Sequence, residues 1–337
     1  MKDFITIGII ARNEEKNILS TLKSLINLKI NNKNYEIILV DGNSTDHTRE
    51  ISDKYLKNQK IKYKIINEKD YGGRGHSFAR NLVVKFSSKD SKYIAFTDAD
   101  CIVDEHWLNF LYEKILNTDS NIAGVGGPRL VKKTSNRKEL IINTFLTSFF
   151  SSGGNPAFSK RKLKYMSSIA GYNSIYKKEI LEKFKYRNEK LTNCDDGEIN
   201  LRISNKGYKF LYSDDAKIYH SETDSIIQFS KNMKRYGMGI INMMILNKTL
   251  ARSYMIFPVV GFNIYLILLI PALFIISWIS LIPLFFYFLY VFICFLEVLY
   301  KTKNIYSLIV FLLSPIQHVS YFIGMFYNLF IKQEFKK

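Results

Sequence analysis

Four short apolar runs alternate with helix-like patterns through the first 120 residues, and this alternation restricts the possible folds most strongly. The runs that we interpret as strands are 4–11, 35–42, 61–68 and 92–100. The first is followed by Ile18, Leu22 and Leu25 at helical spacing, and similar patterns follow the others. Strands that alternate with helices predict a mostly parallel sheet with helices on both faces. The expected fold class is therefore α/β, with another strand and turn at 122–130 and a helix at 140–150.

Polar side chains stand where the predicted strands end. Ala11–Glu14 follows the first strand, Asp41 ends the second, and Asp98 and Asp100 lie one residue apart at the end of the fourth. The carboxyl ends of parallel strands meet at one edge of a sheet, where such sheets bind ligands. Two neighbouring carboxylates raise each other's pKa unless a cation lies between them, and Mg²⁺ or Mn²⁺ would supply that charge. An isolated D-x-D pattern also fits a solvated turn with capping aspartates.

Residues 254–331 are almost free of charge. Glu297, Lys301 and Lys303 are the only Asp, Glu, Lys or Arg residues among them. The stretch is long enough for two or three membrane spans of about 20 residues each. The candidate spans are 255–278, 279–299 and 305–331. Polar residues at the centre of the third also fit a helix that dips into the membrane or lies in the interface, so both numbers of spans stay open. We expect a basic linker at 241–253, transmembrane or interfacial helices at 254–331 and a basic tail at 332–337.

The charge and the cysteines narrow the class of protein further. The formal net charge is +18, and Lys231, Lys234 and Arg235 are among the basic residues just before the apolar tail. This placement favours anionic lipid over nucleic acid as a partner, because no compact basic and aromatic module is present. The three cysteines lack the spacing of a zinc site. No secretory signal pattern is visible, so we expect the polar part on the cytoplasmic side of a cell membrane that the tail crosses more than once.

Six short segments occur in a defined order along the chain. They are IIARNEEKNI (9–18), ILVDGNSTDHT (38–48), GGRGHSFARN (72–81), FTDADC (96–101), GYNSIYKKEIL (171–181) and NCDDGEINLRI (193–203). Each segment alone is a weak signal. In this order and spacing they make the chain resemble the family-2 glycosyltransferases with the GT-A fold, over roughly residues 4–240. The resemblance implies a GT-A-type nucleotide-binding domain at 1–240, followed by the C-terminal transmembrane region.

The resemblance also implies roles for individual residues. Those implied to bind the nucleotide-sugar are Ala11, Arg12, Glu14, Asp41, Gly75, Arg80 and Asp98. Those implied to hold Mn²⁺ or Mg²⁺ are Asp98, Asp100 and His220. The implied catalytic base is Asp196, which would accept the proton of an acceptor hydroxyl as that oxygen attacks the anomeric carbon.

Several of these residues also have purely structural explanations. Asp41 could cap the following helix, and Asp196 could stabilise the start of its own helix. Arg80 could form a structural salt bridge, and a lone histidine such as His220 is commonly a surface or packing residue. The turn after Asp41 reads DGN where many members of the family have DDG, and Asp195 stands where the family often has Glu.

The function implied by the resemblance is an inverting, metal-dependent transfer of one sugar from a UDP- or GDP-linked donor. The acceptor would be a hydroxyl of a lipid-linked or membrane-proximal molecule. Residues 228–239 lack the QxxRW motif of the processive synthases in this family, which favours transfer of a single sugar. One alternative is a polyprenyl-phosphate sugar synthase, whose acceptor is already an anion and needs no base. Another is a catalytically inactive fold that serves as a membrane scaffold or basic binding module.

Overall fold

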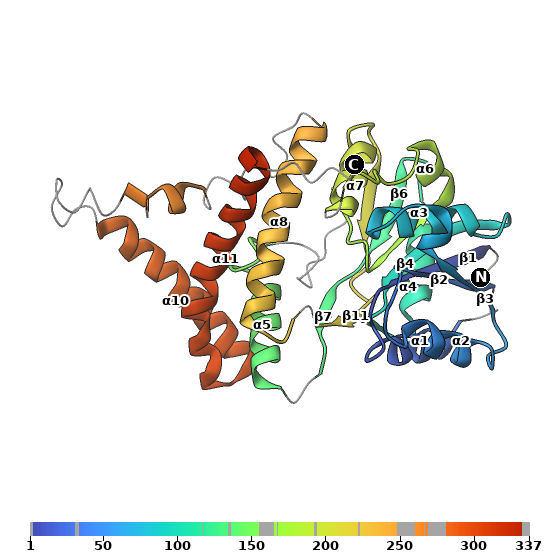
Figure 1. Cartoon of the computed structure of the whole chain (residues 1–337), viewed down its shortest axis with the longest axis horizontal. Helices are drawn as coiled ribbons and strands as arrows, with labels where there is room; N and C mark the ends of the chain where they lie inside the picture. The colour runs from blue at the N-terminus through green and yellow to red at the C-terminus, as the bar shows by residue number, and fades with distance from the viewer. Residues whose placement is uncertain are drawn as a thin grey trace. The chain divides into compact units, whose positions relative to one another are not determined.

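Packing divides the chain into two compact units (Figure 1). The computed structural model describes residues 3–30, 34–116, 118–133, 136–154, 165–166, 168–191, 194–221, 223–247, 260–265, 267–268 and 281–331. The sheet unit comprises Met1–Lys132 and Lys160–His220, and the helical unit comprises Lys133–Ser159 and Ser221–Glu334.

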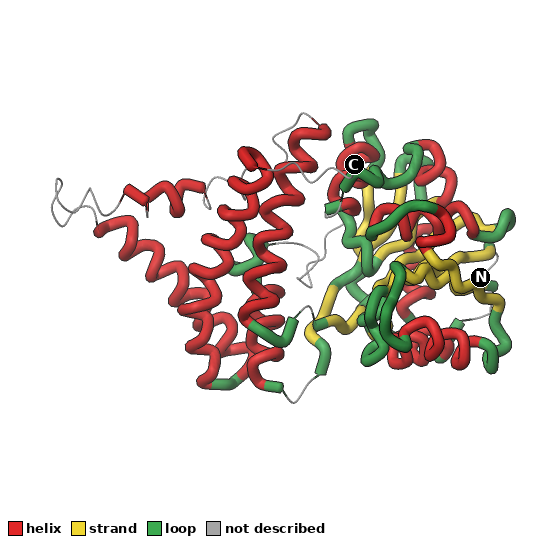
Figure 2. Tube along the Cα trace, in the orientation of Figure 1, coloured by secondary structure: helices red, strands yellow, loops and turns green. Residues whose placement is uncertain are grey.

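An eight-stranded sheet forms the centre of the sheet unit (Figure 2). Its strands, in spatial order, are β3 (Lys62–Asn67), β2 (Tyr35–Asp41), β1 (Phe4–Ala11), β4 (Ser91–Asp98), β9 (Ser174–Lys177), β6 (Ile122–Gly126), β10 (Lys209–Tyr212) and β8 (Tyr165–Met166). The pairs β3–β2, β2–β1, β1–β4 and β6–β10 are parallel, whereas β9 and the edge strand β8 run antiparallel to their neighbours. The prediction of an α/β fold with a mostly parallel sheet is therefore confirmed.

Two hydrophobic cores cover the two faces of this sheet. Successive strand residues point to opposite faces, so Ile37 of β2 belongs to one core and Ile38 to the other. The helices that contribute to the first core are α1 (Ile18–Ile26), α2 (Thr48–Leu56) and α4 (Trp107–Leu116). Those that contribute to the second are α3 (His76–Phe86), α6 (Lys178–Lys183) and α7 (Asp195–Ser204). Helices thus lie on both faces, as predicted (Figure 1), and the strand ends at the rim are left for polar chemistry.

A second, three-stranded sheet lies in the same unit. Its strands, in spatial order, are β5 (Ile102–Val103), β11 (Ile218–His220) and β7 (Arg129–Val131). The strand predicted at 122–130 is therefore two strands, β6 and β7, in different sheets. They separate at Gly127 and Pro128, where proline has no N–H to donate to a neighbouring strand. A Cβ at Gly127 would lie 2.1 Å from the carbonyl oxygen of Ala216, so only glycine fits at this close approach. The pairing of β11 with β5 and β7 brings His220 towards the segment that follows β4.

Helices build the helical unit. They are α5 (Arg137–Thr147), α8 (Ile226–Asn247), α10 (Ile282–Thr302) and α11 (Val310–Phe326), with the short helices η4 (Ile305–Ile309) and η5 (Tyr327–Ile331) before and after α11. Their shared core includes Phe145, Phe229, Val298 and Leu313. The helix predicted at 140–150 corresponds to α5, which ends at Thr147. Residue 240, where we expected the first domain to end, lies within α8, and that expectation stays a prediction.

Two helical stretches among the described residues, Ile282–Thr302 and Ile305–Phe330, are long and apolar enough to cross a membrane. They coincide with the second and third candidate spans, and their length and composition favour membrane association. Of the first candidate span, 255–278, the structure describes only 260–265 and 267–268. Residues 248–253 of the expected linker and the expected tail 332–337 lie outside the described residues.

Helices α8 and α11 pack backbone against backbone at two glycines. A Cβ atom at Gly237 would lie 2.0 Å from the carbonyl oxygen of Tyr321. A Cβ atom at Gly324 would lie 2.0 Å from the carbonyl oxygen of Lys234. Cβ atoms do not approach oxygen atoms so closely, so this crossing requires glycine on both helices. Small residues are common where two helix backbones come this close.

Candidate active site

The ends of β1, β2 and β4 lie beside one another at the carboxyl edge of the large sheet. The parallel register pairs Ala11 with Asp41 across β1 and β2, and Ile10 with Asp98 across β1 and β4. The N–H of Gly42 donates to the carbonyl of Ala11 at 2.8 Å, which fixes the two chain exits against each other. Three of the residues predicted for the site therefore meet at one edge.

Asp41 closes the turn that leaves β2. Its side chain is buried, and both carboxylate oxygens accept from the N–H of Ser44, at 3.3 and 3.2 Å. Asn43 has a φ of +60°, a conformation that asparagine tolerates better than most residues. This contact gives Asp41 a structural role in the turn before α2, and its contact with a nucleobase stays a prediction.

The residues that follow β1 differ in their surroundings. Arg12 is exposed. Glu14 is partly buried and accepts from Asn17 Nδ2 at 2.8 Å. Burial raises the pKa of Glu14; Asp100 raises it further, while Asn17 and His220 oppose the rise. Glu14 is therefore electrostatically coupled to the residues that follow β4.

Asp100 and His220 form the part of the site best suited to a cation. His220 Nε2 lies 2.9 Å from Asp100 Oδ2. Burial would raise the pKa of Asp100, but His220, together with hydrogen bonds from the Asp100 backbone and Cys101, holds the pKa below its ordinary value. Cys101 Sγ completes a group whose ligand atoms lie within 4.8 Å of one another, although burial raises the pKa of this thiol well above its usual range. The oxygen and nitrogen donors, rather than the neutral thiol, fit Mn²⁺ or Mg²⁺.

Arg80 joins the two acidic stretches of the sequence. Its Nη2 lies 2.8 Å from Asp98 Oδ1 and its Nη1 lies 3.0 Å from Asp195 Oδ2. The side chain of Arg80 is 5% exposed. Burial would lower its pKa, but Asp195, Asp98 and Asp196 more than offset this, so the pKa is raised and the group stays charged. Arg80 therefore forms two salt bridges, which confirms the structural role considered for it from the sequence. A contact of Arg80 with the nucleotide-sugar stays a prediction.

Asp196 lies beside Arg80 and is held by the backbone. Its Oδ2 accepts from the N–H of Gly171 at 2.9 Å, and its Oδ1 accepts from the N–H of Gly197 at 2.8 Å. A Cβ at Gly171 would lie 3.2 Å from Arg80 Cζ and 3.4 Å from Asp196 Cβ, so Gly171 lies tightly between the two side chains. The strand ends and the start of α7 therefore converge on one site.

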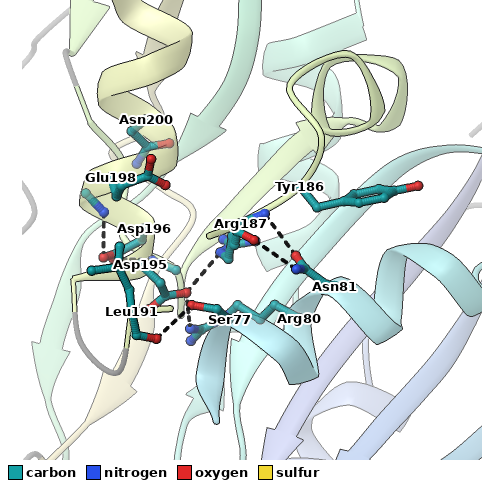
Figure 3. Close-up of polar contacts among 12 residues, drawn as sticks. Ser77, Arg80, Asn81, Tyr186, Arg187, Leu191, Asp195, Asp196, Glu198 and Asn200 are labelled. Carbon is teal, nitrogen blue, oxygen red and sulfur yellow. Dashed lines mark hydrogen bonds and ion pairs between the residues drawn. The ribbon is translucent and has the colours of Figure 1, made fainter. Parts of the chain in front are cut away.

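One charged residue of this cluster was missed by the sequence reasoning. Arg187 Nε lies 3.0 Å from Asp195 Oδ2, so Asp195 has two cationic partners (Figure 3). Burial would raise the pKa of Asp195, but Arg80 and Arg187 together hold it below its ordinary value. A single arginine in the polar segment KYRNEK carries no pattern that could have identified it.

The remaining predicted residue, Gly75, begins α3. Its φ is +97°, which favours glycine at this turn. Arg80 lies on the same helix. Gly75 therefore forms the backbone turn that leads into α3, and its contact with a diphosphate stays a prediction.

Comparison with known proteins gives one consistent result. Residues 6–185 match the family model described as Glycosyl transferase family 2. The chain is 26% identical over 252 residues to "Probable glycosyltransferase YdaM" of Bacillus subtilis, covering 74% of this chain and 58% of that protein. It is 27% identical over 240 residues to a Methanococcus voltae protein named "Dolichyl N-acetyl-alpha-D-glucosaminyl phosphate 3-beta-D-2,3-diacetamido-2,3-dideoxy-beta-D-glucuronosyltransferase", covering 70% of this chain and 72% of that one.

A solved structure shares the fold. It is the mannosyltransferase PcManGT from Pyrobaculum calidifontis, solved in complex with GDP-Man and Mn²⁺. The TM-score is 0.63 at 14% sequence identity, and the match covers 98% of this chain and 88% of that chain. At this identity the likeness concerns the fold.

Proposed function

The chain belongs to glycosyl transferase family 2, and on that premise we propose that it transfers one sugar from a nucleotide-diphospho-sugar to an acceptor hydroxyl, with inversion at the anomeric carbon. One observation carries the proposal. Arg80 contacts both Asp98 and Asp195, so the strand-end acids and the acids of α7, which are far apart in the sequence, lie at one site. A donor at the sheet edge would thereby lie next to a candidate base.

The donor would bind at the carboxyl edge of the sheet. Ala11, Arg12, Glu14, Asp41 and Gly75 come from segments that end or begin at this edge or immediately follow it. Arg12 is exposed, which suits a phosphate contact. We propose a UDP- or GDP-linked sugar. GDP-Man is the nucleotide-sugar bound by the Pyrobaculum protein, and it is therefore the first donor to test.

Asp98, Asp100 and His220 would hold a divalent cation, Mn²⁺ or Mg²⁺. When bound, such an ion supplies positive charge that stabilises the departing nucleotide diphosphate. The side chains of Asp98 and Asp100 are 26% and 29% exposed, so both carboxylates can be reached from solvent. Arg80 keeps Asp98 in place from the buried side.

Asp196 would act as the general base. The backbone N–H groups of Gly171 and Gly197 donate hydrogen bonds to its carboxylate and fix the orientation of that group. The acceptor hydroxyl would lose its proton to Asp196 as its oxygen bonds to the anomeric carbon, and the bond from that carbon to the diphosphate oxygen would break. Attack from the face opposite the leaving group gives inversion.

The acceptor would be lipid-linked or lie close to a membrane. The two apolar stretches of the helical unit favour membrane association, and the name of the Methanococcus relative includes a dolichyl-linked phosphate sugar. We propose that the helical unit crosses the cell membrane more than once and that the sheet unit lies on the cytoplasmic side. Exposed Lys231 and Arg235 on α8 would favour anionic lipid.

Thermal unfolding with a panel of UDP- and GDP-sugars and Mn²⁺ tests the donor site, because a ligand that binds the folded state raises the transition temperature. We expect one donor to stabilise the protein with Mn²⁺ and to lose that effect with EDTA. The same donor should release its nucleotide diphosphate when the membrane fraction supplies the acceptor. A panel that stabilises nothing and releases nothing supports an inactive fold instead.

A further inference from the structure

Asp195 lies between two buried guanidinium groups. Arg187 Nε and Arg80 Nη1 each lie 3.0 Å from the same oxygen, Asp195 Oδ2 (Figure 3). The side chains of Arg187 and Arg80 are 1% and 5% exposed. Both cations meet one oxygen of Asp195, although Arg80 also pairs with Asp98, so the way the two arginines are shared between the two carboxylates calls for an explanation.

The position of Arg187 is fixed from its backbone and from its side chain. Its N–H donates to Asn81 Oδ1 and its carbonyl accepts from Asn81 Nδ2, both at 2.9 Å (Figure 3). Its Cζ lies 4.7 Å from the ring centroid of Phe96 and 5.7 Å from that of Tyr176, which favours a cation there. Since Asn81 follows Arg80 on α3, one turn of that helix locates both arginines.

This arrangement decides which carboxylates Arg80 contacts. A guanidinium with one carboxylate tends to form two parallel N–H···O bonds to it. Arg80 divides its two amino groups instead, with Nη1 to Asp195 and Nη2 to Asp98. Arg187 offsets part of the charge of Asp195, which leaves the second amino group of Arg80 for Asp98.

The same contact bears on Asp196. Asp195 and Asp196 are the first two residues of α7. A fixed Asp195 side chain therefore fixes the first turn of the helix, and that turn places Asp196 Oδ2 at 2.9 Å from the N–H of Gly171. Movement of Asp195 would displace the candidate base.

Resting on the proposed glycosyl transfer, we propose that Arg187 is a positioning residue of the active site. It holds Asp195, and through Asp195 it keeps Arg80 on Asp98 and keeps Asp196 in the orientation needed for proton transfer. Its side chain is buried away from solvent and acts on the reaction only through these neighbours.

Three variants separate positioning from folding. Arg187→Gln removes the charge, and Arg187→Lys keeps a charge near the two rings but replaces the planar group. The matched control is Arg202→Gln. Arg202 lies on α7, the helix that begins at Asp195, and binds Glu198 and the carbonyls of Phe184 and Tyr186. Its loss therefore disturbs that helix without removing a partner of Asp195.

We expect kcat of Arg187→Gln to fall about 100-fold, because a displacement of about 1 Å at a catalytic group costs that much. KM for the donor should change much less, and Arg187→Lys should recover part of kcat. Arg202→Gln should lower the unfolding temperature with little change in kcat of the folded protein. In an Asp195→Asn background, Arg187→Gln should add little further loss, because residues that act through one partner are not additive.

A crystal structure of Arg187→Gln gives a readout that needs no substrate. We expect Arg80 to pair with both oxygens of Asp195 and to leave Asp98. A wild-type protein that turns over no nucleotide-sugar contradicts the proposed function, yet the position of Arg80 still tests the inference. A variant that keeps Arg80 on Asp98 with wild-type kcat overturns the inference. Should Arg187→Gln fail to fold, Arg187→Met, which also removes the charge but keeps a long unbranched side chain, takes its place in both measurements, with the same outcomes.

Discussion

The start of α7 in the sheet unit and the crossing of α8 with α11 in the helical unit are close contacts of opposite kinds. At the start of α7, buried Asp195 lies between Arg80 and Arg187. At the crossing, Gly237 and Gly324 carry no side chain, and the two backbones touch. The first contact is electrostatic, whereas the second is close van der Waals packing of two backbones.

This difference indicates what each contact is for. Buried ion pairs contribute little net stability, because the cost of removing the charges from water offsets their attraction. Close packing of helices contributes to stability directly, and overpacking it is destabilising. We therefore infer that the charges at α7 serve the chemistry of the site, whereas the glycine crossing serves the fold.

The largest predicted effect is the loss of activity in Asp196→Asn. We expect turnover to fall about 1,000-fold, since a general base contributes on that order, while the unfolding temperature changes by only a few degrees. The control is Asp215→Asn, whose carboxylate is 65% exposed and should leave turnover unchanged. Steady-state release of nucleotide diphosphate measures both. A modest loss in Asp196→Asn would favour a phosphate acceptor, which needs no base.

The next largest predicted effect is the loss of folding stability in Gly324→Ala. The new Cβ would lie 2.0 Å from the carbonyl oxygen of Lys234, so the helices must separate. We expect a loss of about 3 kcal/mol, typical of strong overpacking. Gly261→Ala is the matched control, because nothing lies within 4 Å of its added Cβ. Denaturation of the full chain in detergent compares the two variants, and equal stabilities would contradict the packing account.

Acid should weaken the sheet unit through Asp195. Its pKa is lower in the folded state than the ordinary value of 3.8: burial raises it, but Arg80 and Arg187 lower it more. Its contribution to stability is therefore present above pH 3.8 and is lost as the pH falls below it, at up to about 1.4 kcal/mol per pH unit. Urea unfolding at a series of acid pH values should show a shallower loss for Asp195→Asn. If the wild type and Asp195→Asn lose stability at the same rate as the pH falls, the lowered pKa of Asp195 is refuted.

Glu105→Gln should have the smallest effect. Glu105 pairs with Lys29 at 2.9 Å, but the two side chains are 52% and 62% exposed. Water screens such a pair, so its loss should leave the unfolding temperature within experimental scatter. A drop comparable to that of Gly324→Ala would show that exposed charge contributes to the fold, which would break the division between the two kinds of contact.

Patterned segments allowed most of the fold to be predicted. The four strands of the first hundred residues and α5 were found because alternation and helical spacing are local signals. The split of 122–130 into two strands was not predicted, because the close approach of Gly127 to the carbonyl of Ala216 is a contact between residues far apart in the sequence. The antiparallel strand β9 likewise depends on pairing with β4 and β6 rather than on its own residues.

The candidate site was predictable only in part for the same reason. Asp98, Asp100 and Asp196 stand in segments with a recognisable order. Arg187 acts through long-range contacts with Asn81 and Asp195, which leave no pattern in the sequence around it. The choice between a structural and a ligand-binding role for Arg80 depended on burial, which the sequence did not give.

The central claim is that two distant acidic stretches form one site with separate tasks. Calorimetric titration of a nucleotide-sugar with Mn²⁺, alongside turnover, tests it most directly in Asp98→Asn, Asp100→Asn and Asp196→Asn. The account predicts that the first two weaken Mn²⁺-dependent binding by at least about tenfold, and that Asp196→Asn binds normally but does not turn over. Wild-type turnover in Asp196→Asn, or donor binding that is indifferent to Asp98, Asp100 and Mn²⁺, would contradict it.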